Sequence, residues 1–179
     1  MGIGKKGLSH VKSSALKGKP HGYNYFQEAF RVNEFYLKID GKESPGIHKV
    51  SGLSLGEWGT EERFDGGSNI KFKVCNGIVS FPPLVLERYM GAHPAEDKRF
   101  NEWFQEVFKL KGTGESVKST RKNGIIYKQE EGKTVLLFLF YGAWISSIKY
   151  SDLDASTAGF FTQTITLEHL GLEEKILRS

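Results

Sequence analysis

Hydrophobic and polar residues alternate over several stretches of the chain, which is the pattern of half-buried β-strands. The segment Phe35–Ile39 alternates and then meets a turn dipeptide. We predict further strands through His48–Trp58 and through Leu84–Tyr89. The last predicted strand, Phe161–Leu170, alternates large apolar residues with threonines. Together these segments predict antiparallel β-structure.

Two features predict irregular backbone within this pattern. Gly52 interrupts the second predicted strand, which indicates a bulge or the close approach of another backbone segment. The stretch Gly59–Lys73 is polar, with acidic residues and two glycines at its centre. We interpret this stretch as a long, exposed hairpin.

A second hairpin is predicted from Ile125–Gln129 and Thr134–Tyr141, joined by the polar turn 130–133. The second arm contains Val135–Tyr141, which is apolar without alternation. A strand with one wet face alternates, so we expect this strand to be covered on both faces. One cover is the core, and the other is a helix or a second subunit.

One segment, Asp97–Lys109, has helical periodicity. Its large apolar residues follow the i, i+3, i+4, i+7, i+8 spacing, with an acid near the start and lysines near the end. We predict an amphipathic helix at about 97–109 that packs its apolar stripe on the sheet. The stripe consists of Phe100, Trp103, Phe104, Val107 and Phe108.

The predicted fold is mainly β (α+β): an antiparallel sandwich or flattened barrel of about seven strands with one amphipathic helix. We expect a flexible basic arm at 1–28, a single domain at 29–173 and a short tail at 174–179. Glycine supplies 21 of the 179 residues, above the average of about 7%. Abundant glycine suits a turn-rich β protein.

The net charge of +4 is concentrated near the start of the chain. The arm carries five lysines and no acidic residue before Pro20: Lys5, Lys6, Lys12, Lys17 and Lys19. Such an arm is either a solubilising tail or a nucleic-acid contact. We find no secretory signal, and the longest apolar stretch is shorter than the roughly 20 residues of a membrane helix. We therefore expect a soluble, cytoplasmic protein.

Motifs for catalysis, metals or cofactors are missing, so we predict no enzyme activity, no metal site and no cofactor. The G-x-G-x-x-G match at 2–7 lacks the preceding strand that a dinucleotide site needs. The five histidines are scattered, and Cys75 is the only cysteine. Neighbouring carboxylates such as Glu61 and Glu62 point to opposite faces of a strand.

Several segments, taken in order, resemble one protein family. The turn "I-D-G" at 39–41 and "V-S-G-L" at 50–53 are followed by an acidic Gly-Gly hairpin, "L-V-L-E-R" at 84–88 and "F-N-E-W" at 100–103. "A-W-I" at 143–145, "D-L-D-A-S" at 152–156 and "T-I-T-L-E-H" at 164–169 complete the series. They resemble the tail-tube (inner tube) proteins of contractile phage tails, tailocins and phage-derived extracellular contractile injection systems. Ile145 stands where that family tends to have proline.

The resemblance implies a structural subunit that forms hexameric rings, which stack into a hollow tube expelled by sheath contraction. Its implied partners are copies of itself, sheath subunits, baseplate and spike or hub proteins, a tube terminator and cargo in the channel. The implied contacts between rings are Glu61, Glu62, Arg63, Phe64, Asp65, Gly66 and Gly67. The implied contacts between subunits are Val135, Leu137, Leu139 and Tyr141.

Three alternatives remain at this stage. The chain could be a specialised paralogue at the baseplate end of the tube, and the long arm would suit such a specialised contact. It could be a nucleic-acid-binding β-barrel that uses the arm and the basic segment 109–128, and its binding would weaken steeply with salt. It could also be a small-ligand β-barrel with a closed apolar cavity.

Overall fold

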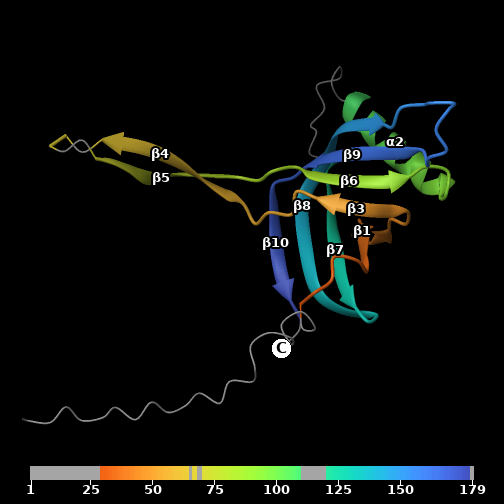
Figure 1. The fold of residues 1–179 in the computed structure, drawn as a ribbon, viewed down its shortest axis with the longest axis horizontal. Helices are drawn as coiled ribbons and strands as arrows, with labels where there is room; N and C mark the ends of the chain where they lie inside the picture. The colour runs from red at the N-terminus through yellow and green to blue at the C-terminus, as the bar shows by residue number, and fades with distance from the viewer. Residues whose placement is uncertain (1–28, 65, 68–69, 110–119, 178–179) are drawn as a thin grey trace, which may run out of the picture. The chain divides into compact units, whose positions relative to one another are not determined.

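A computed structural model describes residues 29–64, 66–67, 70–109 and 120–177. The basic arm therefore lies outside the described residues. Within them the structure is mainly β, with ten strands and one helix (Figure 1). The elements are β1 (Phe35–Ile39), β2 (Lys42–Glu43), β3 (Ile47–Ser51), β4 (Glu57–Phe64), β5 (Lys71–Ser80), β6 (Leu84–Tyr89), α2 (Pro94–Lys109), β7 (Lys122–Glu130), β8 (Lys133–Tyr150), β9 (Thr162–Glu168) and β10 (Gly171–Ile176).

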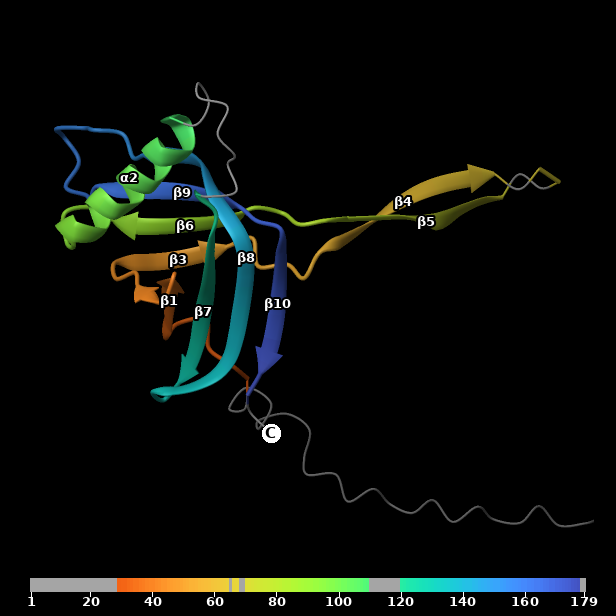
Figure 2. The same ribbon diagram turned by 180° about the vertical axis from the view of Figure 1, so that it is seen from behind.

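Eight strands form one antiparallel sheet in the order β2-β1-β7-β8-β9-β6-β3, and β10 pairs with β8 beside β9. The long strand β8 joins two halves of this sheet. Its first part pairs with β7 and β10, and its last part pairs with β9. Figure 2 shows β7, β8 and β10 crossing the direction of β3, β6 and β9. This sharply bent sheet matches the predicted sandwich or flattened barrel.

Strand β8 changes its partner from β10 to β9 around Gly142, whose φ is +58°. A Cβ on Gly142 would lie 2.7 Å from Leu170 Cδ1, so no larger residue fits without rearrangement. The Gly142 N–H donates to Asn123 Oδ1 at 2.8 Å. A side chain on β7 thus satisfies the backbone where the strand changes its partner.

The core lies between the two halves of the sheet and under the helix. Alternate residues of each strand point into it, as the period-2 pattern requires. The fully buried apolar side chains include Leu37 and Ile39 on β1, Leu84 and Leu86 on β6, Phe140 and Ile145 on β8, and Ile165 and Leu167 on β9. The segments predicted as Phe35–Ile39 and Leu84–Tyr89 are strands with those bounds.

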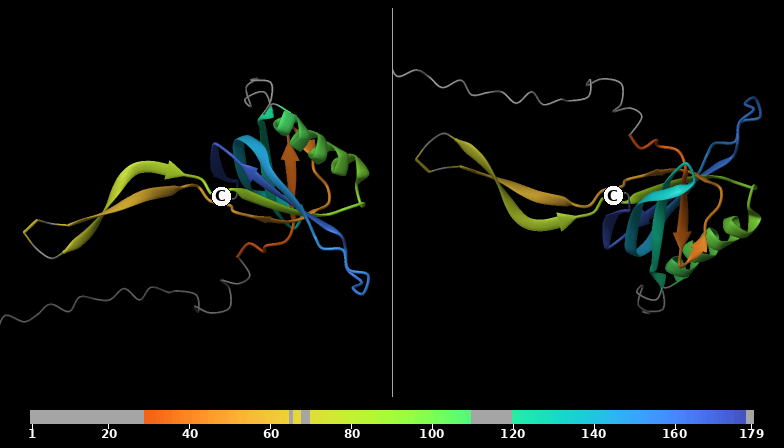
Figure 3. Two further views of the ribbon diagram at one scale, coloured as in Figure 1. Left: turned by 90° about the horizontal axis from the view of Figure 1, so that it is seen from above. Right: turned by 90° about the horizontal axis from the view of Figure 1, so that it is seen from below.

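Helix α2 confirms the predicted amphipathic helix and begins three residues earlier, at Pro94. Proline is favoured in the first turn because its missing N–H has no partner there. Phe100 and Trp103 are buried in the core, and Phe104 and Val107 pack against it. Phe108 lies within the helix, but its side chain is outside the described residues. Figure 3 shows the helix lying along the sheet.

Two sets of interactions hold the helix in place, one with the segment before β7 and one with the sheet. The Trp103 indole N–H donates to the Thr120 carbonyl oxygen at 2.8 Å. The guanidinium of Arg88 is fully buried, pairs with Asp97 at 2.6 Å and donates to Gln163 Oε1 at 3.3 Å. A buried charge needs such partners because its desolvation is costly. Arg88 therefore links β6, β9 and the first turn of α2.

The prediction of a single strand through His48–Trp58 is wrong. Strand β3 ends at Ser51, and β4 starts at Glu57 in a different sheet. Gly52 separates them with a φ of +82°, and a Cβ there would lie 2.1 Å from the Pro83 carbonyl oxygen. The predicted close backbone approach at Gly52 is thus confirmed, and it ends the strand.

The C-terminal part of the chain has more β-structure than its polar composition indicated. Strand β10 pairs with β8 from Gly171↔Tyr141 to Ile176↔Leu136. Strand pairing therefore continues into the segment 174–179 expected as a tail. No helix among the described residues is long and apolar enough to cross a membrane.

Candidate functional site

The β4–β5 hairpin forms a two-stranded sheet of its own. Its strands pair from Glu57↔Ser80 to Phe64↔Lys71, with an irregularity between Trp58 and Thr60. The hairpin predicted at Gly59–Lys73 is therefore present and longer than expected. Glu61, Glu62, Arg63 and Phe64 lie on β4, Gly66 and Gly67 lie in the turn, and Asp65 is outside the described residues.

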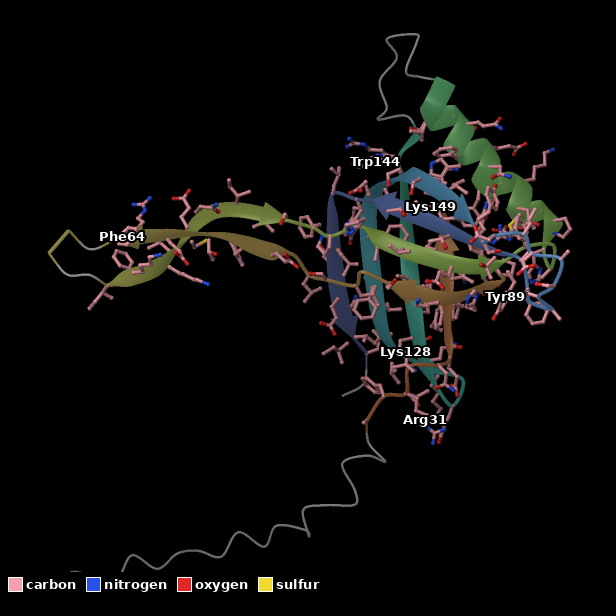
Figure 4. All side chains as sticks on the ribbon, turned by 45° about the horizontal axis from the view of Figure 1, so that its top comes forward. Arg31, Phe64, Tyr89, Lys128, Trp144 and Lys149 are labelled. Carbon is pink, nitrogen blue, oxygen red and sulfur yellow. The ribbon has the colours of Figure 1, made fainter. Side chains whose placement is uncertain are left out.

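Large apolar side chains on this hairpin face solvent. Trp58 is 65% exposed and Phe64 is 69% exposed, and Phe72, Ile78 and Val79 are also exposed. Figure 4 labels Phe64 on β4, where side chains stand out from both strands. A two-stranded hairpin without cover is at best marginally stable in water. The apolar residues of this hairpin therefore indicate a surface that another chain covers.

The charged groups of the hairpin make only weak contacts with one another. Arg63 lies 3.7 Å from Glu61, and Lys71 lies 3.6 Å from Glu62. The Lys71 ammonium also lies 5.1 Å from the centre of the Phe64 ring. Exposed pairs of this kind contribute roughly 0–1 kcal/mol each. They leave the charges available to an incoming partner at small cost.

Strand β8 presents the second predicted contact set on its outward face. Leu137 and Leu139 are half-buried, Tyr141 is exposed and Val135 is buried. Phe138 and Phe140, between them in sequence, pack in the core. Over this stretch both edges of β8 are paired, with β7 on one side and β10 on the other. The side chains of Leu137, Leu139 and Tyr141 are thus available for a face contact, but this part of β8 cannot add a partner strand.

Tyr141 also bonds to the neighbouring edge strand. Its hydroxyl donates to Glu173 Oε2 on β10 at 3.1 Å. Partial burial, the hydrogen bond and the negative charge of Glu173 raise the pKa of Tyr141 above 10.0. The Tyr141 hydroxyl therefore stays protonated, and remains a donor, at any physiological pH.

Several strands have an unpaired edge within the described residues: β2 and β3 at the two ends of the sheet, β10, and both strands of the β4–β5 hairpin. β3 ends one side of the eight-stranded order, and β10 pairs only with β8. The four last residues of β10, Glu173–Ile176, are exposed. An open edge presents unpaired N–H and C=O groups that can bind a strand of another chain.

A third surface, which sequence reasoning missed, gathers aromatic side chains at one end of the sheet. Tyr89 at the end of β6 stacks on His48 with ring centres 4.1 Å apart and meets Phe160 at 5.3 Å. Tyr150 at the end of β8 stacks on Phe161 at 5.8 Å. We call this surface the aromatic end; it comprises His48, Tyr89, Tyr150, Leu153, Phe160 and Phe161. The adjacent pair Phe160-Phe161 beside a predicted strand was the available signal.

The loop that completes the aromatic end is held by a carboxylate. Asp154 accepts hydrogen bonds from the Ser156 hydroxyl at 2.7 Å, the Ser156 N–H at 2.9 Å and the Thr157 hydroxyl at 2.9 Å. The hydrogen bond from the Ser156 hydroxyl contributes most, followed by those from the Ser156 N–H and Thr157. Together they hold the pKa of Asp154 below 3.8. Asp154 is therefore charged at neutral pH.

No group of three metal-binding side chains occurs within the ranges that the structure describes. The single cysteine, Cys75, is exposed on β5. The buried guanidinium of Arg88 and the partly buried carboxylate of Asp97 hold the helix on the sheet. The three surfaces described above are therefore the candidate functional features, and their chemistry is that of association.

Comparison with known proteins gives a family and a fold. The family model described as "T4-like virus tail tube protein gp19" matches residues 31–173. A search of curated protein sequences finds no match.

Solved structures of tube complexes have the same fold. A chain of the PVC sheath–tube complex, from an extracellular contractile injection system in the extended state, is 16% identical with a TM-score of 0.67, covering 88% of this chain and 100% of that one. A chain of the anti-feeding prophage cap, a tube-terminating cap, is 17% identical with a TM-score of 0.69, covering 92% and 99%. A chain of the PVC sheath/tube terminator is 19% identical with a TM-score of 0.63, covering 82% and 96%.

Proposed function

This chain belongs to the T4-like virus tail tube protein gp19 family, and we propose that it builds a hollow tube by joining copies of itself into hexameric rings that stack. The tube is the inner part of a contractile phage tail or a related extracellular injection system, and contraction of a sheath drives it out. The role is mechanical, without catalysis. The protein assembles in the bacterial cytoplasm and then becomes part of the particle.

The β4–β5 hairpin is the observation that carries this proposal. It has exposed apolar side chains along its length and pairs with no other described strand. It therefore needs a cover that a single copy does not provide. We assign that cover to the neighbouring ring, with Glu61 to Gly67 among the contacts.

Lateral contacts within a ring use the open edges of the sheet. The edge of β10 is unpaired and six residues long. Pairing it with a strand of the next copy would satisfy its backbone groups and extend the sheet around the ring. The outward side chains of Leu137, Leu139 and Tyr141, with Val135 beneath them, then lie next to the joint.

Further partners follow from the same role. A sheath must contact the outside of the tube, a terminator must close its far end, and baseplate and spike or hub proteins must start it. We propose these partners, and any cargo in the channel, because related particles contain such components. The proposal includes the case in which this chain is the subunit that starts the tube at the baseplate.

The direct test is to image the purified full chain and to measure its sedimentation. We expect rings, stacked rings or tubes, in amounts that rise with protein concentration. A chain that stays strictly monomeric at tens of micromolar, with no partner protein that recruits it into larger particles, would contradict the proposal.

A double variant tests the hairpin separately from the fold. Phe64→Glu with Phe72→Glu places two charges on exposed side chains, so the core is untouched and thermal unfolding should remain close to that of the natural chain. We expect stacking to be lost while single rings persist. The control is Leu170→Glu, another exposed apolar site outside the hairpin, which should still stack.

A further inference from the structure

The aromatic end lies at the opposite end of the sheet from the base of the hairpin. The hairpin joins β3 at Ser51 and β6 at Leu84, where Ser51 pairs with Val85 and Leu84 pairs with Leu167. At the other end of the same strands, Ile47 pairs with Arg88 and Tyr89 pairs with Thr162. A copy of the chain therefore has an uncovered hairpin at one end of β3 and β6 and an uncovered aromatic cluster at the other.

Side chains of the aromatic end are ordered by mutual stacking yet remain exposed. Phe160 is 82% exposed and Leu153 is 86% exposed. Together with Phe161 and Asp152 they line an open hollow of about 400 Å³. Aromatic clusters that are held in place but left in water are typical of interaction surfaces. Bulky apolar side chains such as those of the hairpin would fit a hollow of this size.

Each surface carries one charge that can form an ion pair between copies. Asp152 and Asp154 are among the residues that line the hollow. Lys73 on the hairpin and Asp152 each lack an ion-pair partner in the part of the chain that the structure describes. Pairing Lys73 of one copy with Asp152 of another would neutralise both groups at the edge of an apolar contact, the usual arrangement of a polar rim.

We propose that the aromatic end receives the β4–β5 hairpin of the next copy. The hairpin of one ring lies on the aromatic end of a subunit in the adjacent ring, with Phe64 or Phe72 against Phe160 and Leu153. Because the two surfaces differ, the contact is heterologous and repeats without closing. This inference rests on the proposed function and adds to it the receiving surface and the direction in which rings stack.

Covering these side chains accounts for the two features that a single copy leaves unexplained. Aromatic residues bury about 150–250 Å² each, so the hairpin and the aromatic end together offer enough area for a stable contact. The hairpin gains the cover that its length requires. The aromatic end loses its contact with water.

Photo-cross-linking of full-length assemblies tests the contact directly. Cysteine is placed at the hairpin by Phe64→Cys in a Cys75→Ser background, because Cys75 is the only natural cysteine, and is labelled with a benzophenone maleimide. After irradiation, mass spectrometry should find cross-links between copies at Tyr89 or within 150–161. The control places the label on an exposed position at the β7–β8 turn by Lys133→Cys, also in Cys75→Ser, and should not label that segment.

The outcomes separate this inference from the proposed function. Assemblies that cross-link from position 64 to another surface, such as β8 or β10, overturn the inference and leave tube formation intact. A chain that forms no rings or tubes at all overturns the proposed function. Labelling of 150–161 within the same copy, shown by mixing isotopically distinct chains, also overturns the inference.

A variant on the receiving side gives a second, independent readout. Phe160→Glu changes a side chain that is almost fully exposed, so folding should be unaffected. We expect the concentration needed for stacking to rise roughly 10- to 100-fold, as loss of one buried aromatic contact implies. Rings should persist, because β10 is unchanged. If the variant stacks at the same protein concentration as the natural chain, the inference is overturned.

Discussion

Gly52 shows how one residue determines where a strand ends. Its backbone has a positive φ, and the space that a Cβ would need is occupied by the Pro83 carbonyl. The chain consequently leaves the eight-stranded sheet at this point and enters the hairpin. The hairpin's direction depends on a residue that has no side chain.

We expect Gly52→Ala to destabilise the fold by about 3 kcal/mol, since a left-handed backbone costs roughly 1–2 kcal/mol and the clash is with backbone rather than with a movable side chain. Thermal or denaturant unfolding of the variant measures this loss. Gly66→Ala is the matched control because nothing lies within 4 Å of a Cβ there. Equal unfolding midpoints for the two variants would contradict the steric explanation.

Asp154 makes the loop of the aromatic end depend on pH. Its folded pKa is depressed below 3.8 by its three donors. The stabilisation is thus fully present above pH 3.8 and is lost as the pH falls through the lower, folded value. Carboxyl NMR of the hairpin double variant should show this titration. Ser156→Ala with Thr157→Val should move the pKa of Asp154 back towards 3.8, and an unchanged value would refute the assigned cause.

At the scale of elements, alternation and periodicity predicted the parts that bury one face. Leu84–Tyr89 and the helix were predictable because their apolar residues follow a single period over the whole element. β10 was not, because only Leu172 of its residues is buried and the remainder is mostly charged. An edge strand with two polar faces carries little periodic signal. Its identity depends on pairing with β8, which is distant in sequence.

The candidate surfaces were predictable to different degrees. The hairpin follows from a polar segment with a glycine turn, and its exposure follows from that composition. The aromatic end depends on His48, Tyr89, Tyr150 and Phe160, which come from four separate segments. The buried Arg88 and Gln163 were equally hidden, because each is a polar residue at a core position that only its partners explain.

The open edge of β10 can be tested with Glu174→Pro. The Leu177 N–H donates to the Val135 carbonyl of β8, so by alternation the Glu174 N–H points away from β8. Proline at 174 would remove a donor from the open edge and keep the ladder to β8. We expect a folded chain, by circular dichroism, that no longer closes rings. Lys149→Ala, on an exposed position of β8 near its end, is the control for surface change.

At the scale of the whole molecule, subunits with two unlike ends form a stack that grows by adding rings at one end at a time. Each added ring offers the same uncovered surface as the ring before it. Such growth stops only when a different protein occupies the last surface. The length of a tube is therefore not encoded in the contacts of this chain alone.

Mixing variants should reveal the two ends. The hairpin double variant keeps the aromatic end, and Phe160→Glu keeps the hairpin, so each should join a growing tube on one side only. We expect either variant, added at a few per cent, to shorten tubes of the natural chain, as measured by electron microscopy. Leu170→Glu added in the same proportion should leave the length distribution unchanged. No shortening by either variant would argue against unlike ends.

The course of β8 has a consequence for how the particle bears load. The first part of β8 is hydrogen-bonded along both edges, its last part pairs with β9, and the strand runs through both halves of the sheet. A force along it would have to shear many hydrogen bonds at once, whereas a force across a free margin would peel them one by one. A tube that is pushed through an envelope resists buckling best when a stiff, uninterrupted strand crosses each subunit, and β8 is such a strand.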